Sequence, residues 1–170
     1  NMEQKFIELK NSKQTFPFGY LIIAAGARHS YFGKPEWETY AWGLKTIKDA
    51  IKIRERMLYS FEKAERTRFE EKRTKYSTFV IIGGGPTGVE MAGAIAEITK
   101  QSMTHNFTQF DPTTSQIILI EGSNQLLNRY PTKLSLQAKK DLEELGVVVK
   151  LNTMVSNVSQ DGVYIDNTLI

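Results

Sequence analysis

Residues 79–90 read Phe79-Val-Ile-Ile-Gly83-Gly84-Gly85-Pro86-Thr87-Gly88-Val89-Glu90. The apolar start is typical of a strand buried on both faces of a parallel sheet, and the segment after the glycines is typical of a helix. In the turn between them, Gly83 permits the tight bend, Gly85 lets the backbone approach a pyrophosphate, and Gly88 lets the helix pack closely on the sheet. The stretch therefore predicts a βαβ unit that binds a dinucleotide.

The helix that begins in this stretch supplies the positive part of the predicted site. Its first backbone N–H groups carry a partial positive charge, so a diphosphate is stabilised there without a basic side chain. Pro86 suits the first helical position, where no N–H is needed. The alternative is a glycine-rich turn that binds no ligand. The residues predicted to contact the pyrophosphate are Gly83, Gly84, Gly85, Pro86, Thr87 and Gly88.

A carboxylate follows the next predicted strand, where Glu121 and Gly122 come directly after Gln116-Ile-Ile-Leu-Ile120. Both residues are predicted to contact the bound dinucleotide. In dinucleotide-binding folds such an acid accepts hydrogen bonds from ribose hydroxyls and disfavours the extra phosphate of NADP. Glu121 lies later than the usual interval of about 20 residues, because a polar loop at 102–114 is inserted before the strand. No arginine follows until Arg129, so NADH is predicted over NADPH. An ordinary carboxylate at a strand end is the alternative.

Glu90 is the candidate catalytic residue, because it lies one turn into the helix on an otherwise apolar face. Either its carboxylate lies near the nicotinamide ring, or it fixes the loop and favours the helix N-terminus. Both interpretations stay open. His29 and His105 are too isolated to suggest a metal pair or an acid–base triad, and both are predicted to lie in loops. No metal site is expected.

Strands and helices alternate along the rest of the chain. Strands are predicted at 20–24, 78–82, 116–121 and 147–151, and helices at 46–68, 86–100 and 132–145. The dipeptide Asp161-Gly162 predicts a hairpin within 154–166, and the aromatic stretch 29–43 is predicted to form neither helix nor strand. The fold class is therefore α/β: a Rossmann-like domain with a parallel sheet, flanking helices and a C-terminal β-hairpin or meander.

Composition narrows the classes of function. The 170 residues are 41% hydrophobic and 24% charged, and no apolar run reaches the length of a membrane span, so we expect the chain to be soluble. There is no cysteine, so redox chemistry must come from a bound cofactor. The net charge of +3 is small, and basic and acidic residues mix along 45–75, so no nucleic-acid partner is expected.

Segments outside the glycine fingerprint carry a family resemblance. Tyr20-Leu-Ile-Ile-Ala-Ala-Gly-Ala27 resembles the second FAD motif of flavoproteins with two dinucleotide domains, although Ala25 replaces the usual threonine. From about Tyr20 to its end, the chain resembles the type II NADH dehydrogenases. The segments that carry the resemblance are 26–33, 43–50, 83–97, 107–112 and 126–134.

The resemblance implies a parent enzyme that passes a hydride from NADH to FAD and then electrons to a membrane quinone. Residues 1–43 would be an edge of the FAD domain plus a linker, in which Ala25 and Gly26 contact FAD. Residues 44–170 would be the NADH-binding domain, incomplete at its C-terminus and inactive by itself. The parent would lie peripherally on a respiratory membrane, facing the compartment that contains NADH; a homodimer is left open.

Two other interpretations remain. The chain could be the NAD(P)H domain of another two-domain flavoprotein, of the NADH oxidase or ferredoxin reductase type. It could instead be a module that senses NADH without catalysis, since a fold does not determine a function. The segment that resembles the FAD motif argues against a sensing module.

Overall fold

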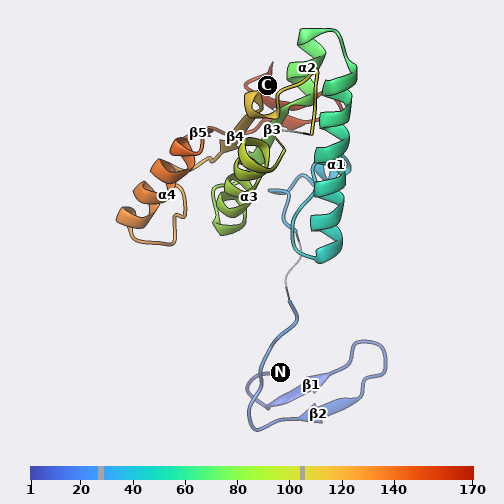
Figure 1. Ribbon diagram of the computed structural model, residues 1–170. Coiled ribbons are helices and arrows are strands. Elements are labelled where there is room, and N and C mark those ends of the chain that lie inside the picture. The colour runs from blue at the N-terminus through green and yellow to red at the C-terminus, as the bar shows by residue number, and fades with distance from the viewer. Residues whose placement is uncertain (27–28, 104–105) are drawn as a thin grey trace.

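The computed structural model describes residues 1–26, 29–103 and 106–170 (Figure 1). At its centre lies a parallel sheet in the order β3-β4-β5, formed by Thr78–Ile82, Gln116–Ile120 and Val147–Lys150. Phe79 lies opposite Ile117 in the first pair of strands. Because the three strands are parallel, their carboxyl ends and the loops that follow them lie along one edge of the sheet.

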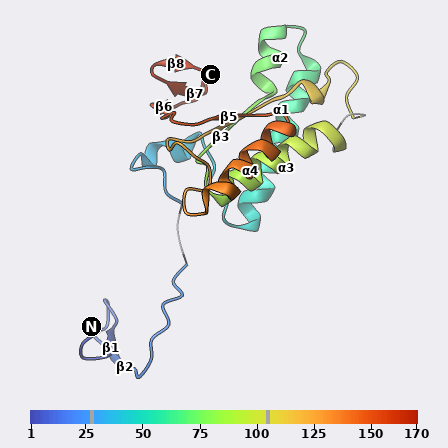
Figure 2. The same ribbon diagram turned by 90° about the vertical axis from the view of Figure 1, so that its left-hand side faces the viewer.

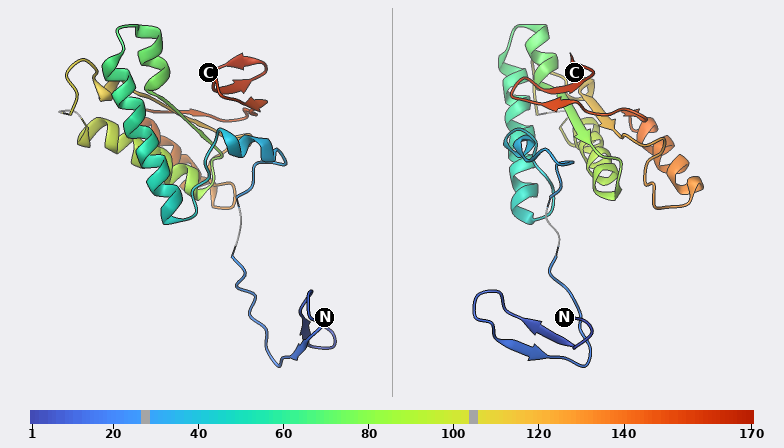
Figure 3. Two further views of the ribbon diagram at one scale, coloured as in Figure 1. Left: turned by 90° about the vertical axis from the view of Figure 1, so that its right-hand side faces the viewer. Right: turned by 180° about the vertical axis from the view of Figure 1, so that it is seen from behind.

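Helices cover one face of this sheet and a small meander covers the other (Figure 2). The helices are α1 (Ile47–Arg66), α2 (Glu70–Tyr76), α3 (Pro86–Glu97) and α4 (Thr132–Glu144). The meander has three antiparallel strands, β6 (Asn157–Val158), β7 (Val163–Ile165) and β8 (Thr168–Leu169) (Figure 3). These layers confirm the predicted α/β class, and the Asp161-Gly162 turn joins β6 to β7 as expected.

Alternate residues of β4 pack into two separate hydrophobic clusters, one on each face of the sheet. Ile117 and Leu119 belong to the larger buried cluster, with residues of α1, α3 and α4, whereas Ile118 and Ile120 pack with Val163 of the meander. Successive side chains of a strand point to opposite faces, so one strand anchors both layers. The continuous apolar run in the sequence follows from this burial on both sides.

The predicted strand at 20–24 is wrong. Residues 21–26 run without helix or strand, and Tyr20, Ile22 and Ile23 are largely exposed. An apolar run forms a buried strand only where a neighbouring strand shares its backbone hydrogen bonds, and among the described residues no strand lies beside this one. The segment instead links the body of the protein to a hairpin that lies well apart from it (Figure 1).

Three further features differ from the sequence predictions. The hairpin, formed by β1 (Phe6–Glu8) and β2 (Thr15–Pro17), was not foreseen. A 3₁₀ helix at Pro35–Thr39 interrupts the aromatic stretch that was predicted to lack helix. The long helix predicted at 46–68 ends at Arg66, and α2 follows as a separate element. No helix in the described ranges combines the length and apolarity needed to cross a bilayer.

Glu65 at the end of α1 holds the inserted loop. Its carboxylate accepts backbone N–H groups of Thr108, Gln109 and Phe110, each at 2.9 Å, and the Thr108 hydroxyl at 2.8 Å. Desolvation acts to raise the pKa of Glu65, but these hydrogen bonds outweigh it and lower the pKa. The insertion is thus anchored before β4 begins. His105 lies outside the described residues.

Candidate dinucleotide-binding site

The glycine turn has the geometry that a phosphate cradle requires. Gly83 follows β3 with φ of +108°, which a residue with a side chain rarely adopts, and its N–H donates to the Ile120 carbonyl at 2.8 Å. Gly85 is the N-cap of α3, and Pro86 takes its first position. A Cβ on Gly88 would run into the Gly83 carbonyl oxygen, so α3 can pack this closely only with glycine there.

Glu121 is hydrogen-bonded to the glycine turn. Its Oε2 accepts the Gly84 N–H at 2.6 Å, while Oε1 accepts the Ser123 N–H at 2.7 Å and the Ser123 hydroxyl at 2.5 Å. The carboxylate that is predicted to bind ribose therefore also fixes Gly84. The sequence could not reveal this contact, because Gly84 and Glu121 are 37 positions apart.

These hydrogen bonds also set the charge of Glu121. Desolvation acts to raise its pKa, but the hydrogen bonds from Ser123 and Gly84 outweigh that effect and hold the pKa below its usual value of 4.5. The group is therefore ionised at neutral pH. An ionised acid beside the turn suits hydroxyl groups and disfavours an additional phosphate.

We expect Glu121→Gln to lower the free energy of unfolding at neutral pH but to leave it nearly unchanged in acid. Because folding lowers the pKa, the carboxylate contributes its full stabilisation above 4.5 and loses it as the pH falls through the folded-state pKa. Urea unfolding of both proteins, followed by circular dichroism, should give midpoints that differ at neutral pH and converge below pH 4.5. A constant difference across this range would contradict a role for the charge.

A second loop, which the sequence analysis missed, supports the turn from the other side. The Leu127 N–H donates to the Gly84 carbonyl at 2.8 Å, and Leu126 is fully buried beside Gly84. Leu127 takes φ of +50°, an uncommon conformation for a leucine. Both polar groups of the Gly84 backbone are thus engaged. The turn is held by residues that follow β4, not only by its own glycines.

The outer side of the turn is open. A Cβ built on Gly85 would meet no atom within 4 Å, and Gly85, Pro86 and Thr87 are exposed. From there a cleft of about 1240 Å³ extends along β3 towards the aromatic stretch, where Phe32 and Trp42 line it. A dinucleotide needs such an opening next to the phosphate cradle.

The other predicted site residues lie outside this arrangement. Glu90 is exposed on α3, and among the described residues none hydrogen-bonds its carboxylate. Gly122 is exposed directly after Glu121. Ala25 and Gly26 lie in the exposed link, and nothing lies within 4 Å of a Cβ on Gly26. The described residues near Ala25 and Gly26 therefore form no cradle for a flavin.

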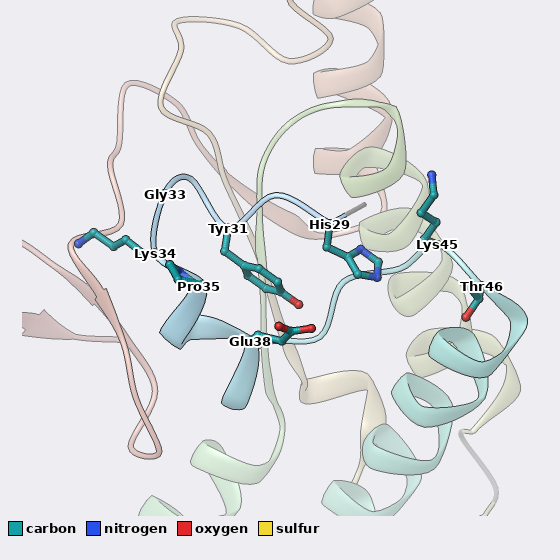
Figure 4. A pocket seen from close by; sticks show the side chains of 8 residues that line it. All are labelled: His29, Tyr31, Gly33, Lys34, Pro35, Glu38, Lys45 and Thr46. Atoms are coloured by element: carbon teal, nitrogen blue, oxygen red, sulfur yellow. The ribbon is translucent and has the colours of Figure 1, made fainter. Parts of the chain in front are cut away.

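A separate hollow of about 520 Å³ lies between the aromatic stretch and the start of α1 (Figure 4). His29 Nε2 there lies 3.5 Å from Asp49 Oδ2, and Asp49 caps the helix together with Thr46. Lys34 points away towards the meander, where its Nζ donates to the Ser156 carbonyl at 2.8 Å. The described residues include no group of three or more potential metal ligands. These contacts hold the aromatic stretch in place, and His29 lies in a loop as predicted.

Comparison with known proteins agrees with this geometry. The family described as pyridine nucleotide-disulphide oxidoreductase matches residues 1–169. Two relatives from Mycobacterium tuberculosis are named type II NADH:quinone oxidoreductases: one is 39% identical over 95% of this chain and 35% of its own length, the other 42% identical over 88% and 32%. The chain spans about a third of the length of these relatives.

Solved structures give the same result. The structure of NDH2 from Plasmodium falciparum in complex with NADH superimposes with a TM-score of 0.75 and 31% identity, over 93% of this chain and 33% of that one. A covalent putidaredoxin reductase–putidaredoxin complex matches with a TM-score of 0.58 and 18% identity, over 98% of this chain and 35% of that one, which shows the fold alone.

Proposed function

Because the chain belongs to the pyridine nucleotide-disulphide oxidoreductase family, we propose that it is the NADH-binding part of an NADH:quinone oxidoreductase. The observation that carries this proposal is the hydrogen bond from the Gly84 N–H to the Glu121 carboxylate. It joins the turn proposed to bind phosphate to the acid proposed to bind ribose. The Mycobacterium relatives named for this activity favour it over another flavoprotein reductase and over a sensing module.

The residues of the turn fit NADH without a basic side chain. The open face at Gly85 admits the pyrophosphate, and the N-terminus of α3 supplies N–H groups and a partial positive charge. Glu121 accepts hydrogen bonds from the ribose hydroxyls and repels a 2′-phosphate. Bound NADH supplies the hydride, and the protein's contribution is to hold and orient it.

The nicotinamide half would extend into the cleft beside the turn. That cleft is lined by exposed aromatic rings, of which Phe32 lies next to Gly83. Glu90 is not among its lining residues, so a role near the ring would require its side chain to approach the cleft in the bound state. Trp37, from the same aromatic stretch, is in contrast buried in the protein.

The rest of the activity is proposed for the whole protein. A quinone as the final oxidant follows from the names of the relatives. FAD as the acceptor, attachment to a respiratory membrane on the side where NADH is present, and a homodimer are proposed from the family resemblance. Ala25 and Gly26 lie exposed in the link, so the described residues around them do not fit a flavin. Residues 1–43 as an edge of a flavin domain and 44–170 as the NADH domain remain a prediction.

Calorimetric titration with NADH and with NADPH tests the proposed site. We expect NADH to bind more tightly than NADPH, because Glu121 repels the 2′-phosphate. Glu121→Gln should reduce the ratio of the NADH affinity to the NADPH affinity, because it weakens the binding of NADH and removes the repulsion of the 2′-phosphate of NADPH. Glu97→Gln is the matched control, because Glu97 is exposed at the far end of α3 and its substitution removes the same charge. Absence of NADH binding, or an unchanged ratio in Glu121→Gln, would refute the assignment.

A further inference from the structure

We propose that Lys34 is a positioning residue for the nicotinamide half of the dinucleotide, because it links two walls of the cleft that would receive that half. This inference rests on the proposed binding of NADH and adds to it a residue outside the glycine turn and the ribose acid. The two walls are the aromatic stretch, residues 29–43, and the meander with the segment that leads into it.

The walls of this cleft come from parts of the chain that are far apart in sequence. The aromatic stretch contributes Phe32 and Trp42 to one side, the meander contributes Val158 and Val163 to another, and β3 lies between them. Among the described strands, no pairing joins the meander to the aromatic stretch. The separation of the two walls therefore depends on contacts made by side chains.

Lys34 makes such a contact across the cleft. Its Nζ donates to the Ser156 carbonyl at 2.8 Å and lies 5.1 Å from the centroid of the Trp37 ring. Figure 4 shows the side chain extending from the aromatic stretch towards the meander. A hydrogen bond from a charged donor is stronger than one between neutral groups, and an ammonium over an indole face is attracted to it.

Both ends of this link belong to ordered parts of the fold. Lys34 is the N-cap of the 3₁₀ helix Pro35–Thr39, and its carbonyl accepts the Trp37 N–H at 3.1 Å. Ser156 is held to β7, because its N–H and its hydroxyl both donate to the Tyr164 carbonyl, at 2.8 Å and 3.1 Å. A contact between two such parts fixes the distance between them.

The linked wall lies on the side of the turn where the nicotinamide half is expected. A Cβ on Gly83 would lie 3.8 Å from the Phe32 ring, so the aromatic stretch passes directly beside the phosphate turn. Glu121, which is proposed to bind the other half, is not among the residues that line the cleft. Without the link, fewer molecules would hold the cleft in its receptive form, and the affinity would fall by that fraction.

Titration with two ligands tests the role of Lys34. ADP-ribose carries both phosphates and both ribose rings of NADH but no nicotinamide. We expect Lys34→Met to weaken NADH binding by about three- to tenfold, as loss of one charged contact implies, and to leave ADP-ribose binding unchanged. Lys34→Arg should restore NADH binding, since a guanidinium also donates and stacks on rings. Lys52→Met is the matched control, because it removes the same charge from an exposed position on α1.

The separation of the two walls can be measured without a ligand. The chain has no cysteine, so Thr39→Cys and Asn157→Cys introduce two sites for spin labels. Both positions are exposed, one on the 3₁₀ helix and one on β6. Pulsed electron paramagnetic resonance then gives the distribution of distances between the labels. We expect Lys34→Met to broaden this distribution and Lys34→Arg to keep it narrow.

Three results would overturn the inference while the proposed function stands. The first is an equal loss of NADH and ADP-ribose binding in Lys34→Met, which would show an effect of charge or folding alone. The second is full NADH affinity in that variant, and the third is a distance distribution as narrow as that of the unmodified chain. If the unmodified chain binds no NADH, the proposed function and the role of Lys34 are both refuted.

Discussion

Gly88→Ala is expected to destabilise the fold by about 3 kcal/mol, at the upper end of the usual cost of overpacking, and to abolish NADH binding with it. The added Cβ would overlap the Gly83 carbonyl oxygen and lie 3.1 Å from the Gly83 carbonyl carbon. Both are backbone atoms, so no flexible side chain can move away. Either α3 shifts from the sheet or the turn opens, and in both cases the N–H groups no longer converge. Urea unfolding measures the stability, and calorimetry measures the binding.

Gly93→Ala is the matched control on the same helix. A Cβ there would lie 3.8 Å from Leu142 Cδ2 and 4.0 Å from Leu145 Cδ1, which is ordinary contact. Alanine replaces glycine inside a helix, so stability should rise by about 0.5–1 kcal/mol. If Gly88→Ala were as stable as Gly93→Ala, the close approach of α3 to the turn would be refuted.

Elements with a strong local signal could be predicted from the sequence. The apolar run that ends at Gly83 gave β3 at Thr78–Ile82 without error, since length, apolarity and a following glycine all agree. Gly146 takes φ of +81° just after α4, as a glycine that ends a helix should. Such features depend on residues that are close together in the sequence.

Features that depend on distant partners could not be predicted. The run at 20–24 has the composition of a buried strand, yet it stays exposed because no strand in the described part of the chain lies beside it. The link from Glu121 to Gly84 and the conformation of Leu127 arise only after two loops meet. The position of Glu121 after β4 predicts that it binds ribose, but the sequence could not show that the same carboxylate also holds the turn.

Gly85→Ala is expected to separate binding from folding, in contrast to Gly88→Ala. Gly85 has φ of −73° and ψ of 178°, an extended conformation that alanine adopts and that suits the residue before a proline. No heavy atom lies within 4 Å of the added Cβ. Stability should therefore stay the same or rise by about 0.4–1 kcal/mol through the lower entropy of the unfolded chain.

Binding of NADH should nevertheless fall by about tenfold to a hundredfold, because the methyl group occupies space that the pyrophosphate needs, at the usual cost of an overpacked contact. Gly19→Ala is the matched control, since a Cβ there also meets no atom within 4 Å but lies far from the turn. Calorimetry with NADH and urea unfolding on the same samples compare the two. Full affinity in a stable Gly85→Ala protein would mean that the phosphate does not approach this backbone. Loss of binding without loss of stability would show that the space outside Gly85 is kept open for a ligand, because nothing in the fold itself requires a glycine there.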